Sequence, residues 1–355
     1  MFLALLTVRN GGKFLEYFLR KTKLFVDGFV INNDASTDDT LEVLNRLKEE
    51  CNIVEIINSE IPIQHSFKND FDNNAETTKY SNDYIVYTKL LDAGRKHGGT
   101  IFYRPSLDEL PSSNFYKDGK SGLKSLTESL EEGEGLSLKW DDVLDNKHNI
   151  RNDSYGQSML QQYLFKDGPG ISYKSSLDFS KDNREYGLLS IPIPIEKIRT
   201  ASNHKYNVLH FQYISFSDTL IKQYHYKLMD GILGKEGSNL LNVNTLNDTF
   251  NQFMLPLLDR IELKLPDDCF TLYEDLDYTT FIGWQDYRIE LIRNILETYG
   301  FEKAQKIFTW VPRHNPIVWG HENWGPLFIK NMDDFEKYLE TIYDIREQDY
   351  NRLKQ

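Results

Sequence analysis

The sequence has few of the features that would assign its class at once. It contains only two cysteines, Cys51 and Cys269, in 355 residues. Two cysteines cannot form a disulfide framework, and their separation does not match a metal-binding motif. A low cysteine content is typical of a reducing compartment, so we expect a cytoplasmic protein.

Long apolar runs are also missing. No stretch approaches the roughly 20 apolar residues that a transmembrane helix needs, so we expect no transmembrane segment; peripheral contact with a membrane is left open. The apolar start, residues 2–8, has no basic leader and no small-residue cleavage site. We therefore predict a first strand there and not a signal peptide.

Positive charge is scarce. The 41 lysines and arginines are outnumbered by 54 aspartates and glutamates, which gives a formal net charge of -13. Nucleic-acid binding depends on Lys and Arg that neutralise phosphates, so we expect no nucleic-acid partner. A local basic patch can still hold one small phosphorylated ligand.

Apolar and aromatic residues are plentiful enough for a folded core. They make up 40% and 13% of the chain, and disordered chains lack such large apolar groups. The length suits two structural units. We predict a first domain over residues 1–230 and a mostly helical region over residues 231–355.

Short apolar runs alternate with helical patterns in the first hundred residues. The runs predict buried strands at 2–8, 28–31, 52–57 and 100–103. Helical spacing of apolar residues predicts helices around 14–19, 41–47 and 75–97. Ser36 or Thr37 is expected to cap the second, and Leu41, Leu44 and Leu47 are expected to form its buried stripe. Further strands are predicted at 135–140 and 208–212, with helices after about residue 217. This alternation predicts an α/β fold with a mostly parallel sheet flanked by helices.

Ligands of parallel sheets bind beyond the carboxyl ends of the strands. This rule directs attention to residues 7–10, 32–38 and 106–109. The second stretch contains Asn33-Asp34-Ala35-Ser36-Thr37-Asp38. It resembles the Asp-Asp-Gly-Ser-Thr-Asp motif of family 2 glycosyltransferases, with Asn33 for the first Asp and Ala35 for Gly.

The resemblance covers about residues 1–230 and implies a GT-A fold, which is Rossmann-like. It implies that Asn33, Asp34 and Ser36 contact the substrate, although a plain helix cap explains the same residues. It also places Thr7, Arg9 and Asn10 beside the nucleotide, because many relatives carry Arg-Asn-Glu there. Arg9 can bind a phosphate with two parallel hydrogen bonds.

The third stretch, Ser106-Leu107-Asp108-Glu109, resembles the family's metal-binding Asp-x-Asp motif. Ser106 stands at the first Asp position and is expected at the substrate. The resemblance implies Mn²⁺ or Mg²⁺ on Asp108 and Glu109, with His210 completing the shell, because hard cations take oxygen ligands and share substrate phosphates. The alternatives are an exposed acidic turn and a core histidine.

A transferase of this kind needs a carboxylate base for the acceptor hydroxyl. Asp141 and Asp142 are the candidates, with Asp153 behind them. Trp140 can stack on a sugar ring, and Lys222 can meet a phosphate. Three tryptophans near the C-terminus, Trp310, Trp319 and Trp324, are either a sugar-stacking surface or packing residues.

The resemblance implies an enzyme that moves a sugar from a nucleotide-diphosphate sugar to a hydroxyl of a glycan or another acceptor. It implies metal dependence, inversion of configuration and a place in polysaccharide or glycoconjugate synthesis. Two alternatives stay open. One is a sugar-phosphate nucleotidyltransferase, faintly suggested by Gly11-Gly12-Lys13. The other is a non-catalytic domain that binds a sugar nucleotide or a partner.

Overall fold

The computed structural model describes residues 1–60, 78–117, 119–152, 160–173, 191–201, 206–222, 225, 262–301 and 331–354. The chain divides into two compact units, and each is described by itself. Unit 1 comprises Met1–Asp142, Ser158–Phe211 and Leu265–Leu276, and unit 2 comprises the remainder. The predicted domain boundary at residue 230 lies outside the described residues and stays a prediction.

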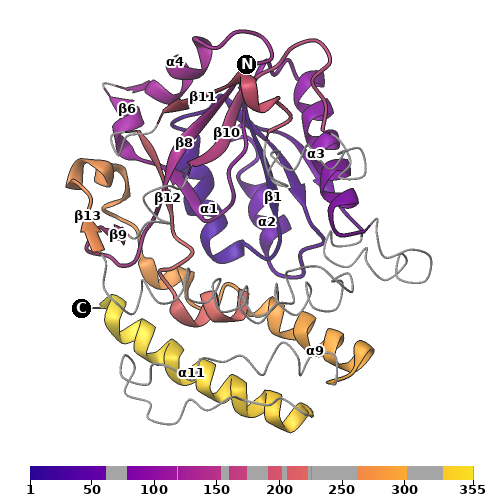
Figure 1. The fold of residues 1–355 in the computed structure, drawn as a ribbon, viewed down its shortest axis with the longest axis vertical. Coiled ribbons are helices and arrows are strands. Elements are labelled where there is room, and N and C mark those ends of the chain that lie inside the picture. Colours follow the sequence, from indigo (N-terminus) through magenta and orange to yellow (C-terminus); the bar gives the residue numbers. More distant parts are fainter. Residues whose placement is uncertain are drawn as a thin grey trace. The chain divides into compact units, whose positions relative to one another are not determined.

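A mixed, mostly parallel sheet forms the centre of unit 1 (Figure 1). Within the described residues its nine strands are β1 (Phe2–Val8), β2 (Gly28–Asn33), β3 (Ile53–Asn58), β4 (Ile101–Tyr103), β5 (Glu109–Pro111), β8 (Gly135–Asp142), β10 (Leu160–Lys166), β11 (Ile198–Ala201) and β12 (Asn207–His210). The order is β3-β2-β1-β4-β10-β8-β12-β5, with β11 paired to β8. β10 and β5 run antiparallel to their neighbours, and the other pairs are parallel. The predicted α/β class is confirmed.

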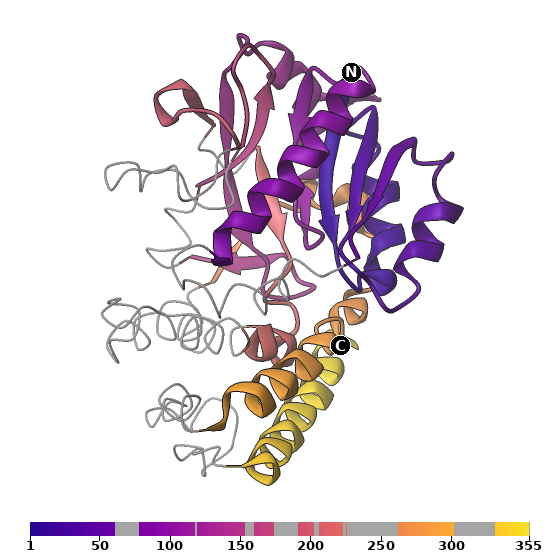
Figure 2. The same cartoon turned by 90° about the vertical axis from the view of Figure 1, so that its right-hand side faces the viewer.

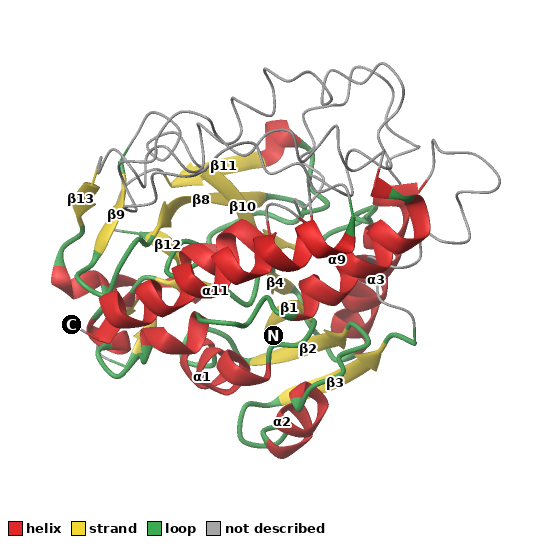
Figure 3. Cartoon of the chain, turned by 90° about the horizontal axis from the view of Figure 1, so that it is seen from below, coloured by secondary structure: helices red, strands yellow, loops and turns green. Residues whose placement is uncertain are grey.

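Helices and short hairpins surround this sheet. They are α1 (Gly12–Thr22), α2 (Thr40–Arg46), α3 (Thr78–Lys96), α4 (Gly122–Glu128), the hairpin of β6 (Tyr116–Lys117) and β7 (Lys120–Ser121), and the 3₁₀ turns η2 (Ser113–Phe115), η5 (Ile195–Lys197), η7 (Asp267–Cys269) and η8 (Thr271–Tyr273). Right-handed crossovers explain which face each helix covers. The chain steps outward from β1 to β2 to β3 through α1 and α2, and returns past β1 to β4 through α3. These opposite directions put α3 on the other face from α1 and α2, as Figure 3 shows.

Both faces of the inner strands are therefore buried. Figure 2 shows α3 running along one face, where Leu90 and Leu91 pack with Leu3, Leu5 and Val30 in one apolar cluster. The residues of β1 that alternate with Leu3 and Leu5 are buried too. A strand covered on both sides reads as a continuous apolar run, which is why residues 2–8 were recognisable from the sequence.

Two local predictions about the second helix were wrong. Neither Ser36 nor Thr37 caps it: α2 begins later, with Asp39 at the N-cap position. Leu41 was expected in the buried stripe but is 37% exposed, whereas Leu44 and Leu47 are buried. The serine and threonine instead bond to the loop after β1.

A distant segment, Leu265–Leu276, returns to unit 1. The Leu272 N–H donates to Ser113 Oγ at 2.9 Å, and Asn114 Nδ2 donates to Cys269 Sγ at 3.3 Å. The Tyr273 hydroxyl donates to the carbonyl of Pro111, the last residue of β5. These contacts fix the outer edge of the sheet beside β12.

Unit 2 is mostly helical in its described part, as predicted for the C-terminal region. It contains a helix over 216–222, the turn η9 (Tyr278–Phe281), α9 (Tyr287–Tyr299) and α11 (Met332–Lys354), and a short ladder of β9 (Asn149–Arg151) with β13 (Glu262–Lys264). α9 and α11 share one apolar cluster that includes Ile292, Leu296, Phe335 and Ile342. None of the described helices combines the length and the apolar character that crossing a membrane requires.

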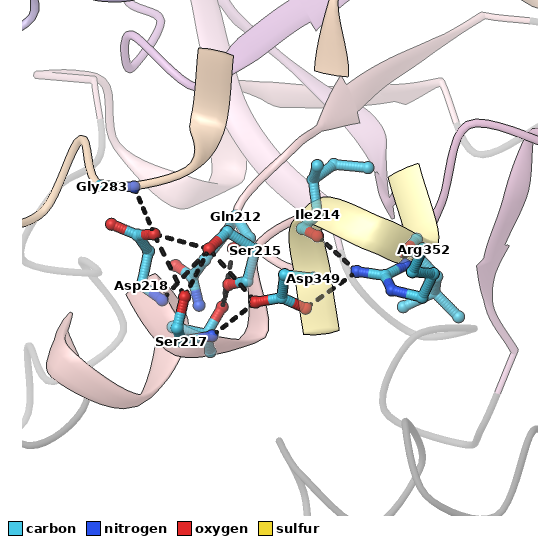
Figure 4. Close-up of polar contacts among 10 residues, drawn as sticks. Gln212, Ile214, Ser215, Ser217, Asp218, Gly283, Asp349 and Arg352 are labelled. Atoms are coloured by element: carbon cyan, nitrogen blue, oxygen red, sulfur yellow. Dashed lines mark hydrogen bonds and ion pairs between the residues drawn. The ribbon is translucent and has the colours of Figure 1, made fainter. Parts of the chain in front are cut away.

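Two buried carboxylates tie the segments of unit 2 together (Figure 4). Asp218 accepts hydrogen bonds from Ser215 Oγ and from the backbone N–H groups of Gly283 and Gln285. Asp349, on α11, accepts from the Ser217 N–H at 2.9 Å and from Arg352 at 3.2 Å. Burial raises the pKa of both carboxyls. Their charged forms therefore depend on these hydrogen-bond donors for stabilisation.

We expect Asp349→Ala to lower the free energy of unfolding by about 3 kcal/mol, because it leaves a buried N–H and a guanidinium without this acceptor. Asp344→Ala is the matched control, since Asp344 is exposed on the same helix and should change stability by less than about 0.5 kcal/mol. Urea unfolding measures both. Equal values for the two variants would contradict a supporting role for the network.

Candidate functional site

The candidate site lies at one edge of the unit 1 sheet. β1, β2, β4, β8 and β12 all run in the same direction, so their carboxyl ends share this edge. The strand order reverses between β1 and β4, and ligands of open α/β sheets bind at such a switch point. Most of the predicted site residues lie at or just past these strand ends.

The loops after β1 and β4 approach each other closely at the switch point. A Cβ added at Gly11 would lie 2.4 Å from Leu107 Cδ2 and 2.7 Å from Val8 Cγ2. Such distances are too short for a real side chain. The absence of a side chain at Gly11 therefore lets the loop that carries Asp108 approach the end of β1.

Three predicted substrate ligands are occupied in joining the loops after β1 and β2. The Asn10 N–H donates to Ser36 Oγ at 3.0 Å, and Asn10 Oδ1 accepts from the Thr37 N–H at 2.8 Å. Asn33 Oδ1 accepts from the Ser36 N–H at 3.3 Å. These hydrogen bonds join Asn10, Asn33 and Ser36 into a frame that links the two loops.

Ala35 adopts a backbone conformation that favours glycine. Its φ is 48°, in the left-handed region where a Cβ costs free energy and glycine does not. The next N–H, that of Ser36, donates to Asn33 Oδ1, and the N–H of Thr37 donates to Asn10 Oδ1.

Thr7, Arg9 and Asp34 remain around this frame. The Thr7 hydroxyl has no hydrogen-bond partner within the described residues. Asp34 is buried, and its backbone N–H donates to the Val8 carbonyl at 2.8 Å. Arg9 is half-buried at the end of β1. All three lie at the carboxyl ends of β1 and β2.

The stretch after β4 is buried and is not an exposed acidic turn. Ser106 is exposed, whereas Asp108 and Glu109 are 3% and 4% exposed. Glu109 Oε2 accepts from the Ser106 N–H at 2.6 Å, and Oε1 accepts from the Tyr163 hydroxyl at 3.0 Å. Burial raises the pKa of Glu109. The role of Glu109 as a metal ligand stays a prediction, and it would use the lone pairs that these two hydrogen bonds leave over.

His210 joins two acidic side chains at the centre of the site. Its Nδ1 lies 2.6 Å from Asp142 Oδ1, and its Nε2 lies 3.4 Å from Asp108 Oδ2. Burial alone would lower the pKa of His210, but the two aspartates outweigh burial and raise it to about 9. The geometry is compatible with both readings of His210, a metal ligand and a buried, hydrogen-bonded core histidine, so its predicted role stays a prediction.

Strand register produces this cluster. β12 lies between β8 and β5, where His210 is opposite Asp142 on one side and Glu109 on the other. The Phe211 N–H also donates to the Asp108 carbonyl at 2.8 Å. Residues that are 30 to 100 positions apart in sequence are thus aligned across three strand ends.

The two candidate bases point to opposite faces of the sheet. Successive side chains alternate along a strand, so Asp141 shares a face with Lys139, and Asp142 shares one with Trp140. Asp141 lies 3.3 Å from Lys139 Nζ and accepts from Asn207 Nδ2 at 2.5 Å. The structure brings Asp142 to His210 and puts Asp141 in a separate buried ion pair.

Trp140 covers the histidine. The two ring centroids are 4.3 Å apart with an interplanar angle of 40°. Trp140 is half-buried, and its indole N–H has no hydrogen-bond partner within the described residues. The tryptophan predicted to stack on a sugar thus lies on the same face as Asp142 and His210.

The donor set fits a divalent cation that is shared with a substrate. In the described part of the chain, no group of three or more His, Cys, Asp or Glu side chains is arranged to hold a metal. Asp108 and His210 are close together, whereas Glu109 uses both oxygens on protein donors. Mg²⁺ and related ions commonly take one or two protein ligands and complete their shell with phosphate and water. The residues present suit that arrangement and not an all-protein centre.

Several predicted residues do not join this cluster. Lys222 belongs to unit 2, where its Nζ donates to Gln212 Oε1 at 2.7 Å, so its phosphate contact stays a prediction. Asp153 and the three C-terminal tryptophans lie outside the described residues. A pocket of about 470 Å³ lies along β3, between α2 and the end of α3, and contains none of the predicted site residues.

Sequence reasoning missed Tyr163, Asn207 and Lys139. Only the Lys139–Asp141 pair had a signal, because residues two apart on a strand share a face. Tyr163 lies on β10, a strand that was not predicted, and Asn207 becomes a partner only through the pairing of β12 with β8. No local pattern identifies such cross-strand contacts.

Comparison with solved structures finds S. aureus TarS. One TarS structure has a TM-score of 0.37 and 14% identity, covering 84% of this chain and 55% of that one. TarS 1–349 has a TM-score of 0.38 and 12% identity, covering 86% and 87%, and its complex with UDP has 0.36 and 13%, covering 93% and 99%. The chain spans about half the length of the first of these structures. No protein-family model and no curated protein matches the sequence.

We expect Asp141→Ala to destabilise unit 1 by about 3–5 kcal/mol, because removal of one partner leaves Lys139 buried without its carboxylate. The double replacement Lys139→Met with Asp141→Leu should cost less than Asp141→Ala alone, since it removes both charges. Chemical denaturation followed by tryptophan fluorescence measures the difference. A double variant that is less stable than Asp141→Ala would argue against the ion pair as the cause.

Proposed function

We propose that this chain is a glycosyltransferase that moves a sugar from a nucleotide-diphosphate sugar to an acceptor hydroxyl. The observation that supports it best is the alignment of Asp108, Asp142 and His210 at the carboxyl edge of a doubly wound sheet, beside the switch point. This geometry places acid groups, an imidazole and a half-buried tryptophan where such sheets bind ligands.

The donor's nucleotide end is assigned to the switch point. Thr7, Arg9 and Asp34 are the proposed contacts, because they lie at the carboxyl ends of β1 and β2, next to the loops that Asn10, Asn33 and Ser36 join. Arg9 suits a phosphate, and Asp34 suits a ribose hydroxyl or a base edge. Ser106 is exposed on the adjoining loop and can donate a hydroxyl to the same ligand.

Asp108 and His210 are the proposed ligands of Mn²⁺ or Mg²⁺. When bound there with the donor, the cation supplies Lewis-acid stabilisation of the departing diphosphate. The protein's contribution is to hold the two ligands 3.4 Å apart before binding and to fix the ring of His210 through Asp142. A hydrogen bond to the second ring nitrogen of a ligand histidine sets its tautomer and orientation.

Asp142 is the proposed catalytic base. In transfer with inversion, the acceptor oxygen bonds to the anomeric carbon as the bond from that carbon to the diphosphate oxygen breaks, and the hydroxyl proton passes to Asp142. His210 holds one carboxylate oxygen of Asp142 and orients the other. Trp140 offers a ring on the same face for the sugar of a glycan acceptor.

We expect one nucleotide sugar from a panel of UDP-, GDP-, CMP- and dTDP-sugars to raise the melting temperature in the presence of Mn²⁺. A ligand at 100 times its Kd stabilises the native state by about 2.7 kcal/mol. The shift should be lost in Asp108→Ala and kept in Asp92→Ala, a control on α3 with an exposed side chain. Scanning fluorimetry measures the melting temperatures of the intact protein and of both variants.

No stabilisation by any nucleotide sugar would overturn the proposed function. Stabilisation without slow hydrolysis or transfer of the donor would indicate a binding domain instead of an enzyme.

Asp142→Asn should lower the rate of transfer by about 10²–10⁴-fold, the usual contribution of a general base, while donor binding changes little. Asparagine keeps an oxygen for His210 Nδ1, so the ring stays in place. Asp141→Asn is the neighbouring control, and its turnover per folded molecule should stay close to that of the intact protein. Single-turnover assays at matched folded concentration test both; equal losses would remove Asp142 from the role of base.

A further inference from the structure

Glu109 closes a tight turn over residues 106–109 by bonding to Ser106. Its side-chain Oε2 accepts the Ser106 N–H at 2.6 Å, and its own backbone N–H donates to the Ser106 carbonyl at 3.2 Å. The turn is thus bonded at both ends between the same two residues. Asp108 lies inside it, so its position depends on the turn.

A neighbouring strand also binds the Glu109 side chain. Tyr163, on β10, is 2% exposed, and its hydroxyl donates to Glu109 Oε1 at 3.0 Å. β10 pairs with β4, the strand that leads into the turn, and the Arg104 N–H donates to the Tyr163 carbonyl at 2.8 Å. Glu109 therefore links the turn to the sheet through a buried, two-sided carboxyl.

The other side of the turn meets the histidine strand. The Phe211 N–H donates to the Asp108 carbonyl at 2.8 Å, and Asp108 Oδ2 lies 3.4 Å from His210 Nε2. A bond lost at Glu109 would loosen Asp108 relative to His210. Supporting partners of this kind commonly change metal affinity by about 10–100-fold when removed.

We infer that Glu109, with Tyr163, is a positioning residue that fixes Asp108 against His210, and that it is not itself a metal ligand. The inference rests on the proposed function for the use of Asp108 and His210. Asp108 is the acidic residue of the turn that lies next to His210. Glu109 supports the turn through Ser106 and Tyr163.

The test compares Glu109→Gln, Glu109→Ala and Tyr163→Phe in the full chain. Glutamine keeps an oxygen for the Ser106 N–H and offers an amide N–H to the Tyr163 oxygen, so Mn²⁺ affinity should stay within about threefold. Glu109→Ala should weaken Mn²⁺ binding by about tenfold or more. Titration calorimetry with Mn²⁺ in the presence of UDP measures the affinity.

A second readout does not depend on a ligand. Amide hydrogen exchange at Ser106 should be at least about tenfold faster in Glu109→Ala, nearly unchanged in Glu109→Gln and intermediate in Tyr163→Phe. The double variant Glu109→Ala with Tyr163→Phe should exchange no faster than Glu109→Ala, because coupled partners are not additive. Tyr163→Phe keeps the test available if Glu109→Ala does not fold.

Loss of Mn²⁺ affinity in Glu109→Gln as large as that in Asp108→Ala would overturn the inference and make Glu109 a ligand. Unchanged exchange at Ser106 in Glu109→Ala and Tyr163→Phe would overturn the role of these two residues in holding the turn. Failure of the proposed function gives a different pattern: neither Mn²⁺ nor any of the UDP-, GDP-, CMP- and dTDP-sugars binds the intact protein, while the exchange differences persist.

Discussion

A single imidazole connects the ends of separate strands in this protein, and its placement depends on the register of β12. His210 is opposite Asp142 on β8 and Glu109 on β5, and it also reaches Asp108. A slip of one residue would turn its side chain to the other face of the sheet. The pairing of the strands therefore aligns the acidic residues with one another and places the imidazole of His210 beside them.

Burial explains why each charge in this region has a partner. Taking a carboxylate out of water costs several kcal/mol unless donors or cations compensate. On one face of the strand end, Asp141 has Lys139 and Asn207. On the other face, Asp142 has His210 beneath the ring of Trp140. The first arrangement stabilises the fold, and the second provides groups that suit proton transfer and anion binding.

The loop frame shows a related division between support and chemistry. Asn10, Asn33 and Ser36 hold the loops after β1 and β2 together, and Ala35 keeps a left-handed backbone. Glu109 similarly closes the loop after β4. Residues that look like ligands in a motif can thus serve to hold the ligands. In the proposed function, Thr7, Arg9, Asp34 and Asp108 are the side chains that such a frame supports.

The sequence by itself determined the α/β class, the first four strands and the strand ends to inspect, because burial on both faces leaves continuous apolar runs and ligands gather at carboxyl ends. It also singled out Asp108 and His210, which the fold brings to within 3.4 Å of each other. It could not separate Asp141 from Asp142, since adjacent residues differ only in the face they occupy. Nor could it show that Glu109 bonds to Tyr163 or that Ser36 bonds to Asn10. Those contacts join residues 26 to 54 positions apart, and only strand pairing, a tertiary property, brings them within hydrogen-bond distance.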